Sequence, residues 1–287
     1  MTELVYVNGE LVPAERAVVP LLDRGYLYGE GLFETMRSYG GRIFALDRHL
    51  RRLLSSAREL GLEFGVGEDD LARALMLTLE ANGLSDAYLR LTVSQQCDTP
   101  GIESRAVERF TISIIARPLA DPSNLHSQGA NVVVLEPGSA PPTHLARHKT
   151  LSYLAYVRAR AAAQSAFADE ALLVNAAGEI TEAATANAFF VREGRLTTPP
   201  VTCGLLPGVT REIVLELARS QGIEAIESIV RPADIPACSE CFLTNSIVEL
   251  QPVTSIDAQP VGSGAPGPVW AVLAAAYSRA TVTIGEP

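Results

Sequence analysis

An Asn-Gly pair near the start of the chain separates two short stretches in which apolar and polar residues alternate. Asn8 and Gly9 both tolerate positive φ angles, so residues 5–12 predict a β-hairpin that forms the first antiparallel edge of the fold. Residues 32–38 and 42–46, which flank Gly40 and Gly41, predict a second hairpin. Hairpins this early in the chain indicate a sheet that is not built as a repeated strand-helix-strand series.

The rest of the chain mixes helices with short strands. A helix is expected at 47–60, because Asp47 can cap it, Gly61 can end it, and its apolar residues lie on one face. Further helices are expected at 69–81, 149–164, 211–220 and 269–279, and strands at 87–94, 109–116, 130–135, 171–175, 188–191, 225–230 and 241–244. Thr210 would cap the helix that starts at 211. The pattern predicts a mixed α/β chain of the α+β class.

Residues 117–129 lose this periodicity and gain proline, serine, asparagine and glycine, which is typical of a connector. At 287 residues and 47 % hydrophobic, the chain is long enough for two domains of ordinary size. We therefore expect an N-terminal domain at 1–118, a linker at 119–129, and a C-terminal domain at 130–287 that contains Lys149.

Charge and hydropathy argue against two classes of partner. The formal net charge is -10 and the arginines are dispersed, which is not the basic footprint of a nucleic-acid-binding protein. No apolar run approaches the roughly 18 residues of a membrane span, and the N-terminus lacks a basic region followed by an apolar core. We expect a soluble protein that lies in the cytoplasm.

The four cysteines and four histidines give little support for a metal site. Cys238 and Cys241 have C-x-x-C spacing, but no second pair and no histidine close in sequence completes a zinc-binding set. His144 and His148 are four residues apart, yet no HExxH glutamate lies between them. We expect reduced thiols, solvated loop histidines and no metal.

Lys149 is the only lysine, and the other 22 of the 23 basic residues are arginines. Arginine can replace lysine wherever a solvated positive charge is enough, but its guanidinium stays protonated and cannot form an imine. Lys149 is therefore a candidate for covalent amine chemistry. The alternative is that an arginine-rich composition has left one surface lysine behind, and the count alone does not decide between the two.

Three features downstream of Lys149 would suit a cofactor that carries an aldehyde, a phosphate and a basic ring nitrogen. Gly208-Val209-Thr210 at a helix start offers backbone N–H groups and a hydroxyl to a phosphate, although a plain threonine cap is the simpler explanation. Glu182 lies among small residues and could contact a ring nitrogen, or it could be a solvated loop glutamate. Thr244-Asn245-Ser246 supplies further donors, or it forms an ordinary turn.

The order of these motifs resembles the class IV aminotransferases, the fold type IV family of pyridoxal-phosphate enzymes. This family includes branched-chain and D-amino-acid aminotransferases, (R)-selective amine transaminases and aminodeoxychorismate lyase. The matching motifs are Asp23 to Arg37, His49-Leu-Arg-Arg-Leu53, His148-Lys-Thr-Leu-Ser-Tyr153, Ile180-Thr-Glu-Ala-Ala-Thr-Ala-Asn187, Leu206-Pro-Gly-Val-Thr-Arg211 and Phe242-Leu-Thr-Asn-Ser246. They extend over nearly the whole chain and favour a chemical role for Lys149.

The resemblance implies a role for each motif. The cofactor-binding residues that it implies for pyridoxal 5'-phosphate are Lys149, Glu182, Arg52, Tyr153, Val209, Thr210, Asn245 and Ser246. Lys149 would form a Schiff base with the cofactor aldehyde and later move the substrate proton, and Glu182 would keep the ring nitrogen protonated, so both would be catalytic. Arg52 and Thr210 would anchor the phosphate.

The resemblance also implies the fold, the assembly and the reaction. It implies an N-terminal antiparallel sheet with helices, a C-terminal pseudo-barrel, and a homodimer in which a neighbour's loop closes each site. The implied reaction moves an amino group between an amino acid, or a primary amine, and a 2-oxo acid. Two alternatives stay open: a lyase that eliminates pyruvate to give 4-aminobenzoate, and a catalytically silent dimeric scaffold, against which Lys149 and Glu182 argue.

The residues near the substrate give conflicting indications. The candidate substrate-binding residues are Phe33, Thr35, Tyr88, Arg90, Gln95 and Ile247. Tyr88-Leu-Arg90 resembles a branched-chain element, although Arg90 could equally be a strand arginine exposed at a sheet edge. Gln95 stands where D-amino-acid enzymes have an arginine, and Thr35 matches a threonine of the lyase. The sequence leaves the stereochemistry of the donor open.

Overall fold

The computed structural model describes residues 3–62, 64–102 and 109–283, and their contacts divide the chain into two units. Among these residues, the N-terminal unit takes in the chain up to Ala120 together with His148–Tyr153. The C-terminal unit takes in Asp121–Arg147 and Leu154–Thr283. Lys149, which the sequence analysis assigned to the C-terminal domain, thus groups with the N-terminal unit.

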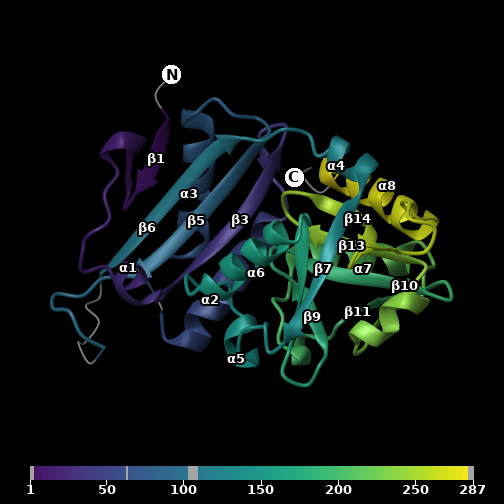
Figure 1. The fold of residues 1–287 in the computed structure, drawn as a ribbon. Helices are drawn as coiled ribbons and strands as arrows, with labels where there is room; N and C mark the ends of the chain where they lie inside the picture. The colour runs from purple at the N-terminus through teal and green to yellow at the C-terminus, as the bar shows by residue number, and fades with distance from the viewer. Residues whose placement is uncertain (1–2, 63, 103–108, 284–287) are drawn as a thin grey trace. The chain divides into compact units, whose positions relative to one another are not determined.

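The N-terminal unit is built on a six-stranded antiparallel sheet in the order β2-β1-β6-β5-β3-β4 (Figure 1). Its strands are β1 (Leu4–Val7), β2 (Glu10–Pro13), β3 (Gly31–Tyr39), β4 (Arg42–Ile43), β5 (Ala87–Gln95) and β6 (Phe110–Pro118). Asn8 and Gly9 have φ angles of 47° and 102°. The hairpin that the Asn-Gly pair predicts is therefore confirmed.

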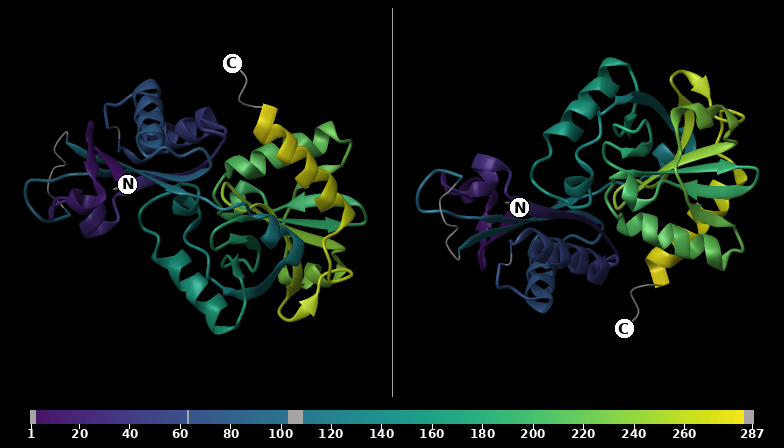
Figure 2. Two further views of the ribbon diagram at one scale, coloured as in Figure 1. Left: turned by 90° about the horizontal axis from the view of Figure 1, so that it is seen from above. Right: turned by 90° about the horizontal axis from the view of Figure 1, so that it is seen from below.

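Two helices, α2 (Leu46–Leu60) and α3 (Glu68–Ala81), cover one face of this sheet (Figure 2). Alternate strand residues such as Leu32, Met36 and Leu89 are buried against them and form the core of the unit. Asp47 lies in the first turn of α2 and does not cap it, because the N-cap is Ala45 at a φ of 51°. Short helical turns at Ala14–Arg16 and α1 (Arg24–Tyr28) complete the unit.

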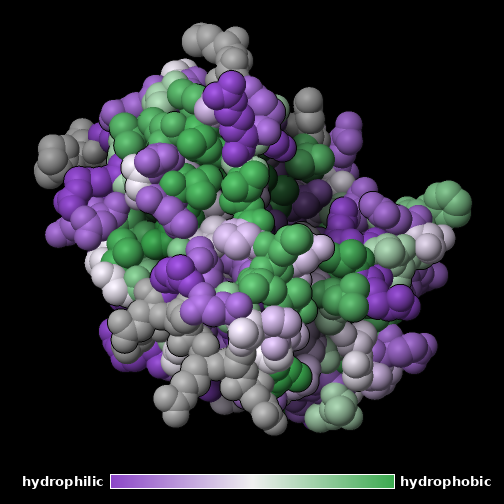
Figure 3. All heavy atoms as spheres, turned by 90° about the vertical axis from the view of Figure 1, so that its left-hand side faces the viewer, coloured by the Kyte–Doolittle hydropathy of each residue, from purple (hydrophilic) through white to green (hydrophobic). Residues whose placement is uncertain are grey.

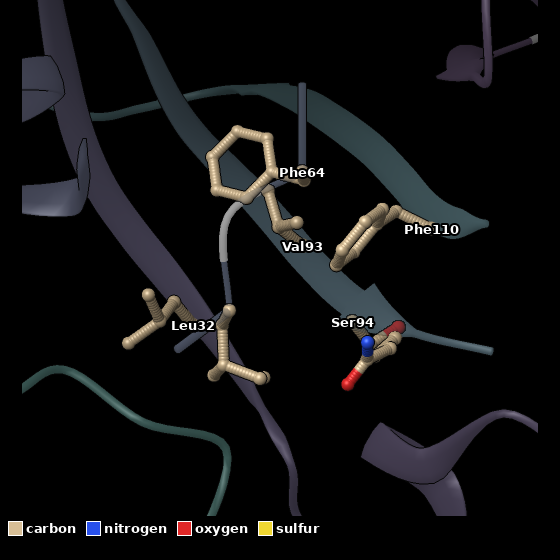
Figure 4. Close-up of a pocket in the computed structure, with 8 residues that line it drawn as sticks. Leu32, Phe64, Val93, Ser94 and Phe110 are labelled. Carbon is tan, nitrogen blue, oxygen red and sulfur yellow. The ribbon is translucent and has the colours of Figure 1, made fainter. Parts of the chain in front are cut away.

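An aromatic pair lies on the helix-covered side of the N-terminal sheet. The rings of Phe64 and Phe110 meet edge to face, with centroids 5.9 Å apart, beside a small apolar pocket that is also lined by Leu32 and Val93 (Figure 4). Gln95 lines the same pocket. Because successive strand residues point to opposite faces, Gln95 lies on the other side of β5 from Arg90, and the structure does not bring these two substrate candidates together.

The C-terminal unit is built on a curled nine-stranded sheet that forms a half-barrel (Figure 1). Eight strands follow the order β12-β11-β10-β13-β14-β7-β8-β9, and β15 pairs with β14. The bounds are β7 (Ala130–Pro137), β8 (Glu170–Val174), β9 (Ile180–Ala183), β10 (Asn187–Arg192), β11 (Arg195–Thr198), β12 (Ala225–Glu227), β13 (Glu240–Asn245), β14 (Glu249–Ile256) and β15 (Gln259–Pro260). β7 runs parallel to both β14 and β8.

Helices pack on both sides of this sheet (Figure 2). They are α4 (Ser123–Gln128), α5 (Thr143–Ala146), α6 (Leu154–Ser165), α7 (Val209–Ser220) and α8 (Pro268–Thr283), with 3-10 turns at Val201–Cys203 and Pro232–Ala237. α7 packs beside α8, and α6 packs on β8 through Ala159 and Ala163. None of the described helices is both long enough and apolar enough to cross a membrane.

The α+β class that the sequence predicts is confirmed. One helix boundary was wrong, because the helix predicted to open at Lys149 begins at Leu154. The structure also has α4 within the segment expected to be a connector, and the strands β11 and β14, which were not predicted. The segment around Lys149 is extended because it pairs with β3, which is distant in sequence.

Candidate active site

The segment that carries Lys149 is extended and pairs with β3. The backbone N–H of Phe33 donates to the carbonyl of Lys149, and the N–H of Leu151 donates to the carbonyl of Gly31, both at 2.9 Å. Thr150 forms an isolated antiparallel bridge with Leu32. This pairing keeps the lysine out of a helix and fixes its backbone against the sheet of the N-terminal unit.

The lysine amine lies over an aromatic ring. Lys149 Nζ is 4.5 Å from the ring centroid of Phe33 and 5.9 Å from that of Tyr153, and the two rings meet edge to face at 5.2 Å. The guanidinium carbon of Arg90 lies 3.8 Å from the same Phe33 centroid. Two cationic side chains therefore share one buried ring, an arrangement that suits an anionic ligand.

The sheet register brings the substrate candidates of this unit together. Phe33 and Thr35 lie on one face of β3, and Thr35 is the direct cross-strand partner of Arg90 on β5. Tyr88 lies on the same face of β5, two residues from Arg90. β5 lies between β6 and β3 in the sheet, so the alternative that Arg90 is an edge arginine was wrong.

Arg52 is held by a buried carboxylate that the sequence analysis did not single out. Its Nε and Nη2 donate to Glu34 at 2.8 and 2.6 Å, and His49 Nδ1 lies 2.8 Å from the same carboxylate. Burial alone would raise the pKa of Glu34, but Arg52 and His49 outweigh burial and lower that pKa from 4.5 to about 2. Burial lowers the pKa of His49. The trio is therefore an ionised carboxylate between a guanidinium and a neutral imidazole.

The two histidines before Lys149 differ in their exposure to solvent. His144 is exposed in α5, in a short helix where the sequence analysis expected a loop. His148 is half-buried, and its Nδ1 lies 3.0 Å from the hydroxyl of Ser56 on α2, so the prediction of a solvated histidine was wrong for this residue. The contact fixes the backbone just before the lysine.

In the C-terminal unit, Glu182 is a buried strand residue and not a solvated loop glutamate. It lies on β9 and is 4 % exposed. Its Oε1 accepts a hydrogen bond from the Tyr156 hydroxyl at 3.0 Å, and its Oε2 accepts from the amide of Asn187 at 3.3 Å and the backbone N–H of Leu206 at 3.1 Å. These three donors fix the orientation of the carboxylate.

The start of α7 is an open helix N-terminus. Gly208 is the N-cap, no side chain among the described residues caps the first turn, and Val209 and Thr210 are buried in that turn. Thr210 is therefore a helical residue and not the cap that the sequence predicted. A Cβ on residue 208 would lie 1.9 Å from Asn187 Oδ1, so any other residue here would displace the Asn187 side chain. A 12-residue helix with such an N-terminus is suited to bind a phosphate.

The turn after β13 combines an ordered backbone with one unsatisfied hydroxyl. Asn245 Oδ1 accepts hydrogen bonds from the N–H groups of Ile247 and Val248, both at 2.8 Å, so its side chain organises the turn that presents Ser246. Thr244 Oγ1 is buried without a hydrogen-bond partner among the described residues. A buried orphan hydroxyl next to an ordered turn fits a ligand oxygen at this end of β13.

Sequence reasoning missed three of the polar partners: Glu34, Tyr156 and Asn187. Glu34 and Asn187 both lie inside motifs that were recognised, and each is directly joined to a candidate residue. Tyr156 contacts a residue 26 positions away, and no local pattern indicates that contact. Among the residues that the structure describes, no cluster of three or more metal-ligating side chains occurs, and the four cysteines are free and buried.

Comparison with known proteins places this geometry in a family context. A family model described as amino-transferase class IV matches residues 31–256. A putative branched-chain-amino-acid aminotransferase of Methanocaldococcus jannaschii is 35 % identical over 260 residues, which cover 90 % of each chain. The D-alanine aminotransferase of Bacillus licheniformis is 32 % identical over 265 residues, which cover 92 % of each chain.

A solved structure agrees over nearly the whole chain. The branched-chain amino acid aminotransferase of Thermobaculum terrenum, in its PLP-bound holo form, aligns with a TM-score of 0.89 and 26 % identity. The alignment covers 98 % of this chain and 94 % of that one.

Proposed function

The chain belongs to the class IV aminotransferase family, and we propose that it transfers an amino group between an amino acid, or a primary amine, and a 2-oxo acid, with pyridoxal phosphate as cofactor. The observation that carries the proposal is the buried carboxylate of Glu182 with its three donors. A buried carboxylate that is oriented in this way is suited to pair with a protonated ring nitrogen. When bound, the cofactor would supply an aldehyde for amines and a ring that withdraws electrons from the bond being broken.

Each unit contains candidate phosphate-binding residues. Arg52 presents a guanidinium whose orientation Glu34 fixes, and the start of α7 presents the backbone N–H groups of Val209 and Thr210. Ser246 adds a hydroxyl from the turn after β13. These groups offer the charge and the directed donors that phosphate oxygens accept.

Lys149 is proposed to form the Schiff base and then to carry the substrate proton on Nζ. Its backbone is fixed by hydrogen bonds to β3, so the amine moves only within the reach of its own side chain. Tyr153 and Phe33 would pack beside it and exclude water. Arg90, next to Thr35 and Tyr88, would bind the substrate carboxylate.

We also propose that the protein is a cytoplasmic homodimer. Large apolar side chains are exposed in both units, and they include Val18, Leu21, Tyr26, Leu154, Val157 and Phe167. Hydrophobic groups gather at several places on the side of the molecule where Figure 1 shows α1 (Figure 3). Exposed apolar patches commonly mark protein-protein interfaces. The four free cysteines suit a reducing compartment.

We also propose domains at 1–118 and 130–287, with a linker at 119–129 between them.

A half-reaction screen tests the function. Purified protein with pyridoxal phosphate should show the absorbance of a lysine-bound cofactor, and this band should disappear on addition of a competent donor. L-amino acids, D-amino acids and (R)-amines are compared in parallel, which identifies the stereochemistry of the donor. The proposal is abandoned if the wild-type protein binds no cofactor, or if Lys149→Ala leaves the band unchanged. Release of 4-aminobenzoate from aminodeoxychorismate would instead identify the lyase.

A further inference from the structure

The turn between β13 and β14 is held by side chains from other segments of the C-terminal unit. It comprises residues 246–248, and Asn245 and Glu249 pair across its base. Glu249 has a φ of 59°, a left-handed conformation that is unfavourable by about 1–2 kcal/mol for a residue with a side chain. The turn therefore needs contacts outside the hairpin to keep its shape.

Asn245 supplies the first of these contacts. While Oδ1 accepts hydrogen bonds from the N–H groups of Ile247 and Val248, Nδ2 donates to the carbonyl of Thr185 at 3.0 Å. Thr185 is itself held in place, because its hydroxyl donates to Oε2 of the buried Glu170 at 2.5 Å. One amide side chain thus joins the turn to the segment that follows β9.

His126 supplies the second contact, from the opposite end of the turn. Its Nε2 lies 2.7 Å from the carbonyl oxygen of Val248, and since a carbonyl can only accept, Nε2 must carry the proton. The imidazole packs edge to face on Trp270, with centroids 6.4 Å apart, and Trp270 Nε1 donates to the carbonyl of Leu250 at 2.9 Å. The contact with Trp270 therefore helps to orient the imidazole of His126 for its hydrogen bond to Val248.

We propose that His126 and Asn245 are positioning residues for the phosphate group of the cofactor, which they affect by fixing the turn that carries Ser246. His126 Nε2 donates to the carbonyl oxygen of Val248, two residues after Ser246, and so fixes this end of the turn. Asn245 fixes the same turn through the N–H groups of Ile247 and Val248. This inference rests on the proposed function, because it assumes that Ser246 binds the phosphate of pyridoxal phosphate.

The test compares two ligands that differ only in the phosphate. Apo-protein is titrated with pyridoxal phosphate and with pyridoxal, and the affinity for each is followed by absorbance. His126→Phe keeps a ring beside Trp270 but removes the donor, and it should weaken binding of pyridoxal phosphate about 5- to 10-fold, as expected for one lost hydrogen bond. Binding of pyridoxal should not change. Asn245→Ala, which removes three hydrogen bonds, should cause a larger selective loss.

Two further variants control the comparison. His126→Gln retains an amide donor and should restore most of the affinity for pyridoxal phosphate. His144→Phe makes the same change at an exposed histidine and should leave both affinities at the wild-type value. If His126→Phe does not fold, as judged by circular dichroism, His126→Ala replaces it with the same expectation.

The possible outcomes separate the two proposals. Equal loss of affinity for both ligands, or a His126→Phe variant that matches His144→Phe, would overturn the positioning role while the proposed function stands. A wild-type protein that binds neither ligand would overturn the proposed function and this inference together. Selective loss for pyridoxal phosphate, with rescue by His126→Gln, supports the positioning role.

Discussion

Arg52 donates two hydrogen bonds to the carboxylate of Glu34, from Nε at 2.8 Å and from Nη2 at 2.6 Å. The carboxylate is 1 % exposed and the arginine 12 %, so the pair lies almost entirely out of water. Arg52 lies on α2 and Glu34 on β3. Their contact orients the guanidinium that we propose to bind the phosphate of the cofactor. The packing of α2 on β3 therefore determines where this guanidinium lies.

Glu34→Gln should destabilise the protein, because it leaves the charge of Arg52 buried without its partner. Removal of one member of a buried pair typically costs about 3–5 kcal/mol, and the retained amide oxygen should reduce this to about 2–3 kcal/mol. The measurement is urea denaturation at pH 7. Asp70→Asn is the control, because it removes a carboxylate from an exposed pair with Arg73, and it should change the free energy of unfolding by no more than about 0.5 kcal/mol. Equal effects of the two changes would contradict a structural role for Glu34.

The same carboxylate predicts a defined response to acid. The pKa of Glu34 is lowered from 4.5 to about 2 in the folded protein, so folding favours its ionised form. The stability that it contributes is fully present above pH 4.5 and is lost as the pH falls toward 2. Denaturation followed from neutral pH down toward the folded pKa should show a steeper loss of stability for the wild-type protein than for Glu34→Gln. Parallel curves would show that other carboxylates control the acid response.

The sequence identified the hairpins and the two catalytic candidates, because both depend on local patterns. Asn8 and Gly9 determine their turn by their own φ preferences, and Lys149 stands out by its chemistry and its motif. The environment of Glu182 was not predictable in the same way. Its donors come from Tyr156 and Leu206, 26 and 24 residues away, and only the folded chain brings them together. The helix expected at Lys149 failed for a similar reason, since pairing with β3 outweighs local helix propensity.

Gly208→Ala should damage the start of α7, and a second N-cap glycine provides a matched comparison. A methyl group on residue 208 would lie 1.9 Å from Asn187 Oδ1, whereas nothing lies within 4 Å of the corresponding position on Gly67, the N-cap of α3. Displacement of Asn187 would also remove a donor from Glu182. We expect Gly208→Ala to lose about 1–3 kcal/mol of stability more than Gly67→Ala, together with affinity for pyridoxal phosphate. Thermal denaturation of both variants checks this difference.

Three of the cysteines should be unreactive in the native protein. Burial raises the pKa of Cys203 to about 11, helped by its hydrogen bond to Glu179, and burial also raises the pKa of Cys238 and Cys241. Because the thiolate is the reactive form, labelling by iodoacetamide at pH 8 should be slow at these three sites. Site-resolved mass spectrometry should detect rapid labelling only after unfolding in urea. Fast native labelling at Cys241 would show that β13 opens at this position.

Arg90→Leu distinguishes recognition of a carboxylate from general damage to the active site. If Arg90 binds the substrate carboxylate, its loss should lower kcat/KM about 10- to 100-fold for amino acids and 2-oxo acids, as expected for one charge-assisted hydrogen-bonded contact. The half-reaction with a primary amine that has no carboxylate should keep its rate. Arg117→Leu is the control, because Arg117 lies on the neighbouring strand β6, is exposed, and pairs with Glu3. An equal loss for both classes of donor would mean that Arg90 acts through the packing of Phe33, whose ring also contacts the amine of Lys149.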